Sequence, residues 1–437
     1  MFHVSCFIFH VRLCYTIPIM NFSKTYDNGL RLVSCKLPGM RSVSVGVWVG
    51  AGSAFEDERN NGVSHFIEHM LFKGTEKRSA YEIADSIDRL GAQINAFTAK
   101  ECTCYYTKSV DEHVEKCFEI LSDLFFNSVF DKAEMKREKG VICEEIKMVE
   151  DAPEDVCHEL AAEALFNKHA LGRRILGPAK NVRSFTKQHI LDHMDRYYGA
   201  GNAVIAIAGN IEDADADRLA EKYFASKFNK ACPPVEYACA NEPKNTFLSK
   251  TKKIEQANIA IVFPSIPFND PDNYAVTLFN FIFGASMSCR LFQKVREKLG
   301  LAYSVYAYVS AYKNCGMYSI FCGTSPENSA KAVAAVRQEI DAVLRDGITK
   351  DEFARGKEQM KSNFILGQES SVSIMNVLGK TMLLGNEVFD LDKKVEELNK
   401  VTIDDVVRAY TDIFDFKKAC AAYVSSDKKD ILKIFLN

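Results

Sequence analysis

Two histidines and a glutamate stand close together in the sequence, within the stretch from Gly62 to Gly74. If that stretch is helical, His65 and His69 lie one turn apart on the same face, because residues four apart on an α-helix are neighbours. Two imidazoles so placed can bind one metal ion, and the carboxylate of Glu68 can reach a water molecule on that ion without being a ligand itself. The alternative is a structural helix in which these three side chains hydrogen-bond one another beneath apolar neighbours.

A long helix is predicted over residues 131–149, and two of its acidic residues fall on its apolar face, which is made of Val141, Ile142, Met148 and Val149. Glu145 follows Val141 by four residues and Glu138 precedes Glu145 by seven, so both carboxylates are expected to point inward. An unpaired buried charge is costly, so a cation must compensate it. We therefore predict Glu145 as the third metal ligand and Glu138 as a carboxylate that supports a ligand or carries a proton. Glu144 lies about 100° away around the helix and is the weaker candidate.

The composition describes a soluble globular protein. The chain has 437 residues, which predicts two domains of about 200 residues each. A net charge of −3, without a long block of like charge, gives no indication of nucleic-acid binding. No apolar run is long enough for a transmembrane helix. The 14 cysteines are scattered singly, which favours reduced thiols in a reducing compartment over a disulfide framework.

The second half of the sequence repeats the order of elements in the first half. Half-buried strands are expected between residues 28 and 50. Strands predicted at 93–98 and 103–109 recur at 303–310 and 316–323, and a helix predicted at 288–298 stands where the helix of the two histidines stood. No histidine follows His193, so the second half cannot build a second histidine site. The sequence predicts an α+β fold of two homologous domains, each a mainly antiparallel sheet packed against helices in a duplicated half-barrel, clam-shell arrangement.

The domain boundaries follow from composition. Residues 1–19 are apolar but are a poor signal or transit peptide, and folded-looking sequence begins directly after Met20. These 19 residues are therefore expected to be absent from the native protein or disordered on it. Residues 20–229 are predicted to be the catalytic, metal-binding domain, and residues 230–244, which are rich in proline, the linker. Residues 245–437 are predicted to form the homologous second domain.

The sequence resembles the insulinase/pitrilysin family of zinc peptidases, in particular its processing-peptidase branch with the mitochondrial β subunit and bacterial homologues. The likeness rests on several motifs: the inverted order His-x-x-Glu-His at residues 65–69, Glu145 with 75 residues between it and His69, the strand at 95–98 followed by residues 103–106, and the segment 296–303. Only one glycine stands at residues 283–287, where the noncatalytic α subunit has a glycine-rich loop. That difference favours the catalytic type of subunit.

The resemblance implies a zinc endopeptidase that binds one Zn²⁺ per chain through His65, His69 and Glu145. Glu68 would take a proton from a water molecule on the metal. Arg296 and Tyr303 would hold the substrate carbonyl and stabilise the oxyanion. The substrate, an unfolded peptide or presequence, would lie extended along the strand that contains Asn95, Ala96 and Phe97.

The resemblance also implies a closed chamber of four homologous domains, so a homodimer or a heterodimer with a related subunit is expected. Neither a nucleic acid nor insertion into a membrane is expected. The bacterial-type likeness predicts a cytoplasmic protein, with the mitochondrial matrix as the alternative. The second functional hypothesis is a noncatalytic peptide-binding or scaffold subunit of the same family, against which the intact Glu68 and the three ligands speak.

Overall fold

Residues 21–228, 235–237, 240 and 242–437 are described by the structure, a computed structural model of the chain. The expected extension at residues 1–19 lies outside the described residues, as does part of the expected linker at 230–244. Across the described part, no helix is both long and apolar enough to cross a membrane.

The first half forms a six-stranded sheet in the order β1-β2-β6-β3-β5-β4. All its neighbouring strands are antiparallel except the parallel pair β2 and β6. Strand β4 is an edge strand, so one of its sides has no partner strand among the described residues. The strands are β1 (Asn21–Thr25), β2 (Arg31–Lys36), β3 (Ser42–Val49), β4 (Gln93–Thr98), β5 (Thr103–Val110) and β6 (Ala203–Gly209).

The second half forms a five-stranded sheet in the order β7-β11-β8-β10-β9. This order repeats that of β2-β6-β3-β5-β4, and the single parallel pair, β7 and β11, again stands at the same place. The predicted α+β fold of two homologous sheets with helices is therefore confirmed. The strands are β7 (Phe247–Thr251), β8 (Ala257–Ser265), β9 (Ser304–Ala311), β10 (Gly316–Thr324) and β11 (Cys420–Ser425).

The helices of each half cover one face of the half's own sheet and form its main apolar core. In the first half these helices and the connecting ones are α1 (Val63–Leu71), α2 (Ala80–Asp88), α3 (Val114–Asn127), α4 (Lys132–Asp151), α5 (Pro153–Phe166), α6 (Ala179–Ser184), α7 (Lys187–Tyr197) and α8 (Asp213–Tyr223). In the second half they are α9 (Asn273–Phe283), α10 (Ser329–Asp346), α11 (Lys350–Leu366), α12 (Ser371–Lys380), α13 (Leu391–Lys400), α14 (Ile403–Ile413) and α15 (Ile431–Leu436).

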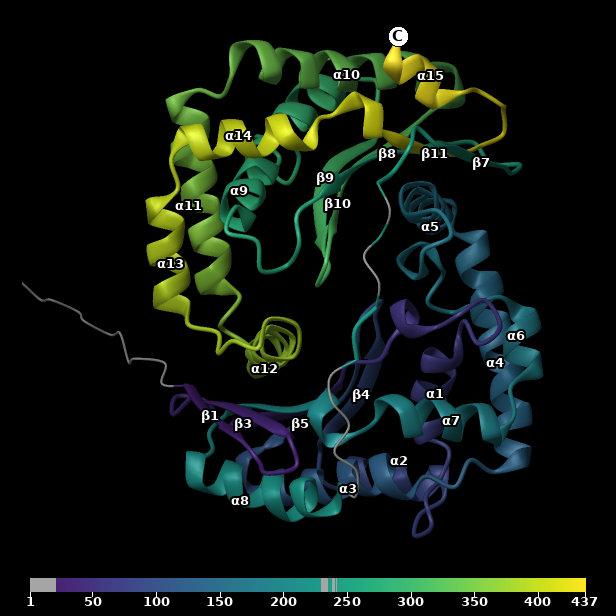
Figure 1. Cartoon of the computed structure of the whole chain (residues 1–437), viewed down its shortest axis with the longest axis vertical. Coiled ribbons are helices and arrows are strands. Elements are labelled where there is room, and N and C mark those ends of the chain that lie inside the picture. Colours follow the sequence, from purple (N-terminus) through teal and green to yellow (C-terminus); the bar gives the residue numbers. More distant parts are fainter. Residues whose placement is uncertain (1–20, 229–234, 238–239, 241) are drawn as a thin grey trace, which may run out of the picture.

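The two halves exchange one helix each. Helix α5 of the first half packs against β8 and β11 of the second sheet, and α12 of the second half packs against β3 and β6 of the first sheet. Figure 1 shows α12 lying over the lower sheet and α5 beside the upper one. This exchange corrects the prediction of half-buried strands at residues 28–50: β2 and β3 are buried on both faces, because α12 covers the face that the first half leaves open.

The buried face of α4 differs from the predicted one. Val141 and Met148 are exposed, whereas Ile142 is buried and lies on the same face as Glu138. The prediction was wrong for these two apolar residues because a helix of this length can carry apolar side chains on its solvent face. The inward orientation of Glu138 nevertheless holds, since its side chain is 4% exposed.

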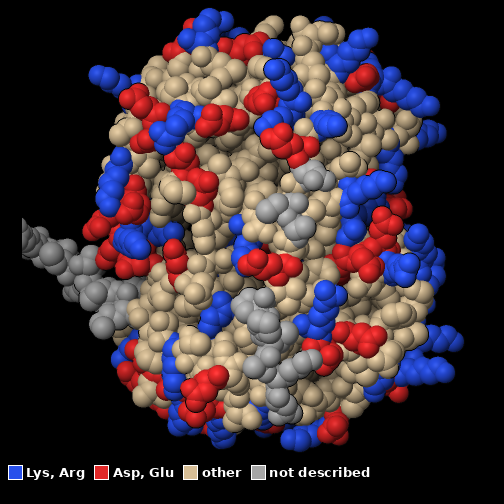
Figure 2. Space-filling model, viewed as in Figure 1, with Lys and Arg blue, Asp and Glu red and all other residues tan. Residues whose placement is uncertain are grey.

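The helix predicted at residues 288–298 is shorter and wound differently. Its π-helical part is Phe292–Lys298, and only Arg290 and Leu291 before it are α-helical. Charges of both signs are interspersed over the face of the molecule shown in Figure 2, in keeping with the net charge of −3.

Candidate metal centre

A buried carboxylate caps the helix that carries the two histidines. Glu56 is 4% exposed, and its two oxygens accept hydrogen bonds of 2.8 Å from the backbone N–H groups of Gly62 and Ser64, at the start of α1. Asn61 donates a third hydrogen bond to it. Burial raises the pKa of Glu56, and these hydrogen bonds oppose the rise. A negative charge at a helix N-terminus satisfies free N–H groups and the helix dipole, so Glu56 fixes where α1 begins.

Three potential ligand atoms converge between α1 and α4. The Nε2 atoms of His65 and His69 lie 3.7 Å and 3.5 Å from Oε2 of Glu145, and the three ligand atoms lie within 4.8 Å of one another. A tetrahedral metal about 2 Å from each ligand separates two ligand atoms by roughly 3.3–3.5 Å. Within the part of the chain that the structure describes, this is the one group of three such side chains that could hold a metal ion.

The protonation of both histidines suits metal binding. Burial, together with the neighbouring His69, lowers the pKa of His65 to about 3, so its ring is neutral. Nδ1 of His69 donates a hydrogen bond of 2.8 Å to Glu138, which leaves the lone pair on Nε2 toward Glu145. Lys73 pairs with the other oxygen of Glu138 at 2.9 Å. Burial raises the pKa of Glu138, but the bonds from His69 and Lys73 outweigh it and lower the pKa below the usual value.

These residues fit a zinc ion by their donor set. Two neutral imidazoles and one carboxylate form the His₂Glu set of catalytic zinc sites, which leaves a fourth position open. Glu138 lies behind His69 in the position that carboxylates commonly take behind ligating histidines. Glu144 points to solvent and pairs with Lys147 at 2.7 Å, so it takes no part in the group.

Glu68 stands beside the group without belonging to it. Its Oε2 accepts a hydrogen bond of 2.5 Å from the hydroxyl of Thr98, at the end of β4. Burial raises the pKa of Glu68, while Thr98 and His69 oppose the rise. Among the described residues, Oε1 has no hydrogen-bond partner. The carboxylate is thus oriented by one oxygen and has the other available for a proton.

A cavity of about 540 Å³ opens beside these side chains and is bounded by both halves. The first half contributes His65, Glu68 and Glu145, together with Ala96, Phe97 and Thr98 of the edge strand β4. The second half contributes Tyr308, Ser310 and Tyr312, from β9 and the turn after it. The candidate metal site therefore faces a space between the two sheets.

Two family models match the chain. The model described as "Insulinase (Peptidase family M16)" matches residues 31–179, and the model described as "Peptidase M16 inactive domain" matches residues 184–360. The chain is 43% identical to the uncharacterized zinc protease YmxG of Bacillus subtilis, over 87% of this chain and 93% of that one. The chain belongs to the insulinase family of peptidases.

Further relatives agree with this assignment. An uncharacterized zinc protease of Streptomyces coelicolor is 35% identical over 89% of this chain and 86% of its own. The solved structure of a peptidase M16 inactive domain from Pseudomonas fluorescens covers 94% of this chain and 98% of its own with a TM-score of 0.87, at 21% identity. A protease from Helicobacter pylori covers 93% and 100% with a TM-score of 0.85, at 20% identity. These two structures show the fold alone.

The structure does not bring all the predicted residues of this insulinase-family chain into one place. Arg296 lies in the π-helix and its guanidinium stacks 4.6 Å from the ring centre of Phe292 and 5.9 Å from that of Tyr303. Tyr303 is 75% exposed, and neither Arg296 nor Tyr303 lines the cavity at the metal ligands. Asn95 is exposed on β4 and also lies outside the cavity lining, whereas Ala96 lines it. The roles of these residues remain predictions.

Several residues near the site were not found from the sequence. Thr98 orients Glu68, Lys100 lines the cavity, and His158 of α5 lines it together with Tyr308. Burial lowers the pKa of Lys100 to about 8, and its Nζ donates to the carbonyl of Arg173. The alternation of tyrosines along 306–312 was the available signal for this part of the wall, because alternate strand residues share a face.

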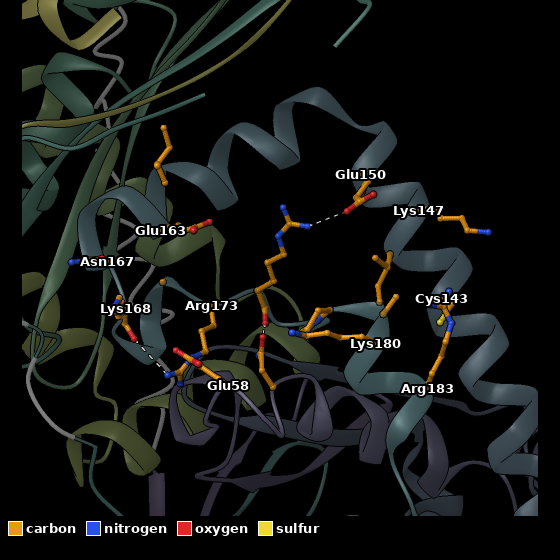
Figure 3. Close-up of a pocket in the computed structure, with 18 of the residues that line it drawn as sticks. Glu58, Cys143, Lys147, Glu150, Glu163, Asn167, Lys168, Arg173, Lys180 and Arg183 are labelled. Atoms are coloured by element: carbon orange, nitrogen blue, oxygen red, sulfur yellow. Dashed lines mark hydrogen bonds and ion pairs between the residues drawn. The ribbon is translucent and has the colours of Figure 1, made fainter. Parts of the chain in front are cut away.

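A second cavity, of about 840 Å³, lies between α4, α5 and α6 and has a different chemistry. Figure 3 shows the basic and acidic side chains around it, including Lys147, Glu150, Lys168, Arg173 and Lys180. Several of them are satisfied within the protein: Arg174 pairs with Glu150 at 3.3 Å, and Arg173 donates to the carbonyl of Lys168 at 3.5 Å. The metal ligands do not line this cavity, so it is not the candidate active site.

Proposed function

We propose that the protein is a zinc-dependent endopeptidase that hydrolyses extended, unfolded peptides or presequences. The observation that carries the proposal is the convergence of His65, His69 and Glu145 beside Glu68, at a cavity bordered by the free edge of β4. The names of the relatives, which are zinc proteases, support the metal and the reaction class. Zinc in such a site supplies a Lewis acid and lowers the pKa of a water molecule.

Glu68 is the general base and then the general acid. Thr98 occupies its Oε2, so Oε1 accepts the proton of the attacking water and passes it to the leaving amine. Its burial, which raises its pKa, suits a group that must hold a proton for part of the cycle. His69 is held in the ligating tautomer by Glu138.

The substrate binds as an additional strand on β4. An edge strand offers unpaired N–H and C=O groups, and a peptide that pairs with them gains affinity largely independent of its sequence. Asn95, Ala96 and Phe97 precede Thr98 on this strand, and Thr98 hydrogen-bonds Glu68. A folded protein cannot present such a strand, so it is expected to resist cleavage.

Arg296 and Tyr303 act on the substrate carbonyl from a second chain. Their mutual stacking and their position outside the cavity support a role across a subunit boundary. The chain is therefore proposed to work as a dimer, either with itself or with a related subunit. The alternative, a noncatalytic peptide-binding or scaffold subunit, would need only the cavity and the edge strand.

Zinc content and cleavage of a fluorogenic unstructured peptide, measured for wild type and for Glu68→Gln, separate the two functions. Wild type is expected to hold one zinc per chain and to cleave the peptide. Glu68→Gln keeps the shape of the side chain but cannot take the proton, so its kcat should fall about 10²–10⁴-fold with zinc retained. Glu144→Gln, a neighbour of Glu145 that points to solvent, is the control and should match wild type.

Wild type without stoichiometric zinc would contradict the proposal. Equal cleavage by wild type and Glu68→Gln would also contradict it. Peptide binding by wild type with neither zinc nor cleavage would instead identify the noncatalytic function.

A further inference from the structure

A chain of four hydrogen-bonded side chains reaches the cavity at the metal ligands, and two of its members, His158 and Tyr308, line that cavity. Tyr306 donates a hydrogen bond of 2.6 Å to Oε1 of Glu154. Nε2 of His158 lies 2.9 Å from the hydroxyl of Tyr306, and its Nδ1 lies 2.9 Å from the hydroxyl of Tyr308. The imidazole also packs on Phe321, with the ring centres 4.9 Å apart. Both ring nitrogens are thus occupied, and the ring is fixed in orientation.

The carboxylate of Glu154 determines the direction of every hydrogen bond in this chain. Tyr306 has one proton and gives it to Glu154, so the oxygen of Tyr306 must accept from Nε2–H of His158. Burial lowers the pKa of His158, so the ring is neutral and Nδ1 carries no proton. Nδ1 must therefore accept from the hydroxyl of Tyr308. The proton of Tyr308 is committed to His158, so its oxygen can act only as an acceptor. The neighbouring Ser319 hydroxyl can occupy one lone pair of this oxygen, and a hydroxyl oxygen has a second one for a ligand.

We propose that Tyr308 is a substrate-binding residue whose oxygen accepts a hydrogen bond from an N–H group of the bound peptide, and that His158 is the positioning residue that gives it this polarity. Tyr308 and His158 both line the cavity that contains His65 and Glu68. The N–H group is either a backbone group of the peptide, on the side of the bound strand that does not pair with β4, or part of a peptide side chain. The inference deepens the proposed function, because it assigns a second wall to the same substrate.

The first test measures peptide binding rather than cleavage. In a Glu68→Gln background, which is expected to bind without turnover, the affinity for a fluorescent unstructured peptide is compared before and after Tyr308→Phe. Loss of one hydrogen-bond acceptor is expected to weaken binding about 5–10-fold. In the active enzyme the same substitution should raise KM by a similar factor and change kcat less than about twofold. Tyr81→Phe, which removes a hydroxyl from an exposed tyrosine on α2, should leave both measurements unchanged.

The second test separates a positioning role of His158 from a structural one. His158→Phe keeps a ring on Phe321 but removes both nitrogens, so it should weaken binding about as much as Tyr308→Phe. His158→Gln can still donate to Tyr306 and accept from Tyr308, so it should restore most of the affinity. Weakening by His158→Phe without rescue by His158→Gln would overturn the positioning role.

The third test identifies the donor on the peptide. Two peptide series are made, one with single backbone N-methylations and one with single donor side chains replaced by norleucine. In one of the two series, the change at a single peptide position should weaken binding to the protein that retains Tyr308. The same change should not weaken binding to Tyr308→Phe any further, because the acceptor is already missing there. The inference is overturned if neither series contains such a position, or if Tyr308→Phe binds within about twofold of its parent. Tyr308-dependent binding in a chain that holds no zinc would support the inference while contradicting the proposed peptidase.

Discussion

The helices α5 and α12 occupy equivalent places in the two halves, but the residues around them differ in polarity. Each helix belongs to one half of the chain and covers the face of the other half's sheet that the helices of that half leave uncovered. Helix α12 closes its face with apolar contacts, in which the indole of Trp48 meets Met375 at 3.4 Å between Nε1 and Sδ. Helix α5 buries apolar residues against the second sheet, but its polar residues Asp155, His158 and Glu159 line the cavity, and His158 also contacts β9 and β10.

The difference shows how a duplicated fold acquires one site and not two. Gly379 of α12 and Gly46 of β3 allow the closest contacts, because a Cβ on Gly379 would lie 2.2 Å from the indole of Trp48 and one on Gly46 would lie 2.4 Å from Sδ of Met375. Helix α5 also packs closely on its sheet, but α4 directly precedes it and brings Glu145 to the cavity beside it. The candidate site therefore lies where polar residues of α5 border the cavity.

Removal of the third candidate ligand, Glu145, should abolish peptide cleavage while leaving the packing of α12 on the first sheet intact. Glu145→Gln is expected to lower zinc affinity by more than the roughly 10–100-fold that loss of an outer partner causes, and to reduce cleavage in proportion. Zinc titration and peptide cleavage measure the effect, with Glu144→Gln as the matched control. Retention of full zinc affinity would show that Glu145 is not a ligand.

Removal of the indole should do the reverse and weaken the closed interface while leaving the three candidate ligands in place, even though its ring packs edge-on against Phe97 of the cavity wall. Trp48 is 2% exposed, so Trp48→Ala leaves a large cavity under α12 and should lower the free energy of unfolding by about 3–5 kcal/mol. Denaturant unfolding measures this, and zinc content of the folded protein should stay at one per chain. A loss below about 1 kcal/mol would mean that α12 does not close the sheet as described.

Loss of an ion pair in the second half would show whether that half can be destabilised by a change that lies on neither α5 nor α12. Arg290 donates to both oxygens of Glu352, at 2.6 Å and 2.9 Å. Burial raises the pKa of Glu352, but these bonds and that from Thr349 outweigh it and lower the pKa from 4.5 to about 2. A shift of this size corresponds to about 3 kcal/mol for the carboxylate, whose side chain is 16% exposed.

The pH dependence follows from the lowered pKa. Because the folded state favours the ionised carboxylate, its contribution is complete above about pH 4.5 and is lost as pH falls through about 2. Glu352→Gln should therefore destabilise the protein by about 3 kcal/mol near neutral pH, and the difference from wild type should shrink on acidification below about pH 4.5. A difference that grows on acidification would contradict the assignment.

The smallest expected effect concerns the face of α4 that carries Glu145. Val141 is 52% exposed, so Val141→Ala should change the free energy of unfolding by less than about 0.5 kcal/mol. Ile142, which is fully buried, is the matched contrast and should cost about 2–4 kcal/mol when replaced by Ala. Equal losses in the free energy of unfolding for the two variants would mean that Val141 is buried, as the sequence predicted.

The candidate ligands were accessible from the sequence because their relationships are local. His65, Glu68 and His69 lie within one and a half turns of one helix, and Glu138 and Glu145 lie two turns apart on another. The apolar face of α4 was predicted partly wrongly, since Val141 and Met148 give a periodic signal but point to solvent. The cap at Glu56 and the hydrogen bond from Thr98 were not predicted, because each joins residues whose proximity depends on the surrounding fold.

The sequence by itself determined the candidate metal ligands, the duplicated order of strands and the absence of histidines from the second half. Only the tertiary structure decided that α5 and α12 cross between the halves, that β2 and β3 are buried on both faces, and that Tyr308 and His158 line the same cavity as His65 and Glu145. The physical reason is that periodicity reports which face of an element is buried, whereas the partner that buries it is chosen by packing between residues far apart in the chain. The candidate ligands lie on α1 and α4, and another part of the cavity wall comes from β9, whose alternating tyrosines indicate a shared face but not which residues that face meets.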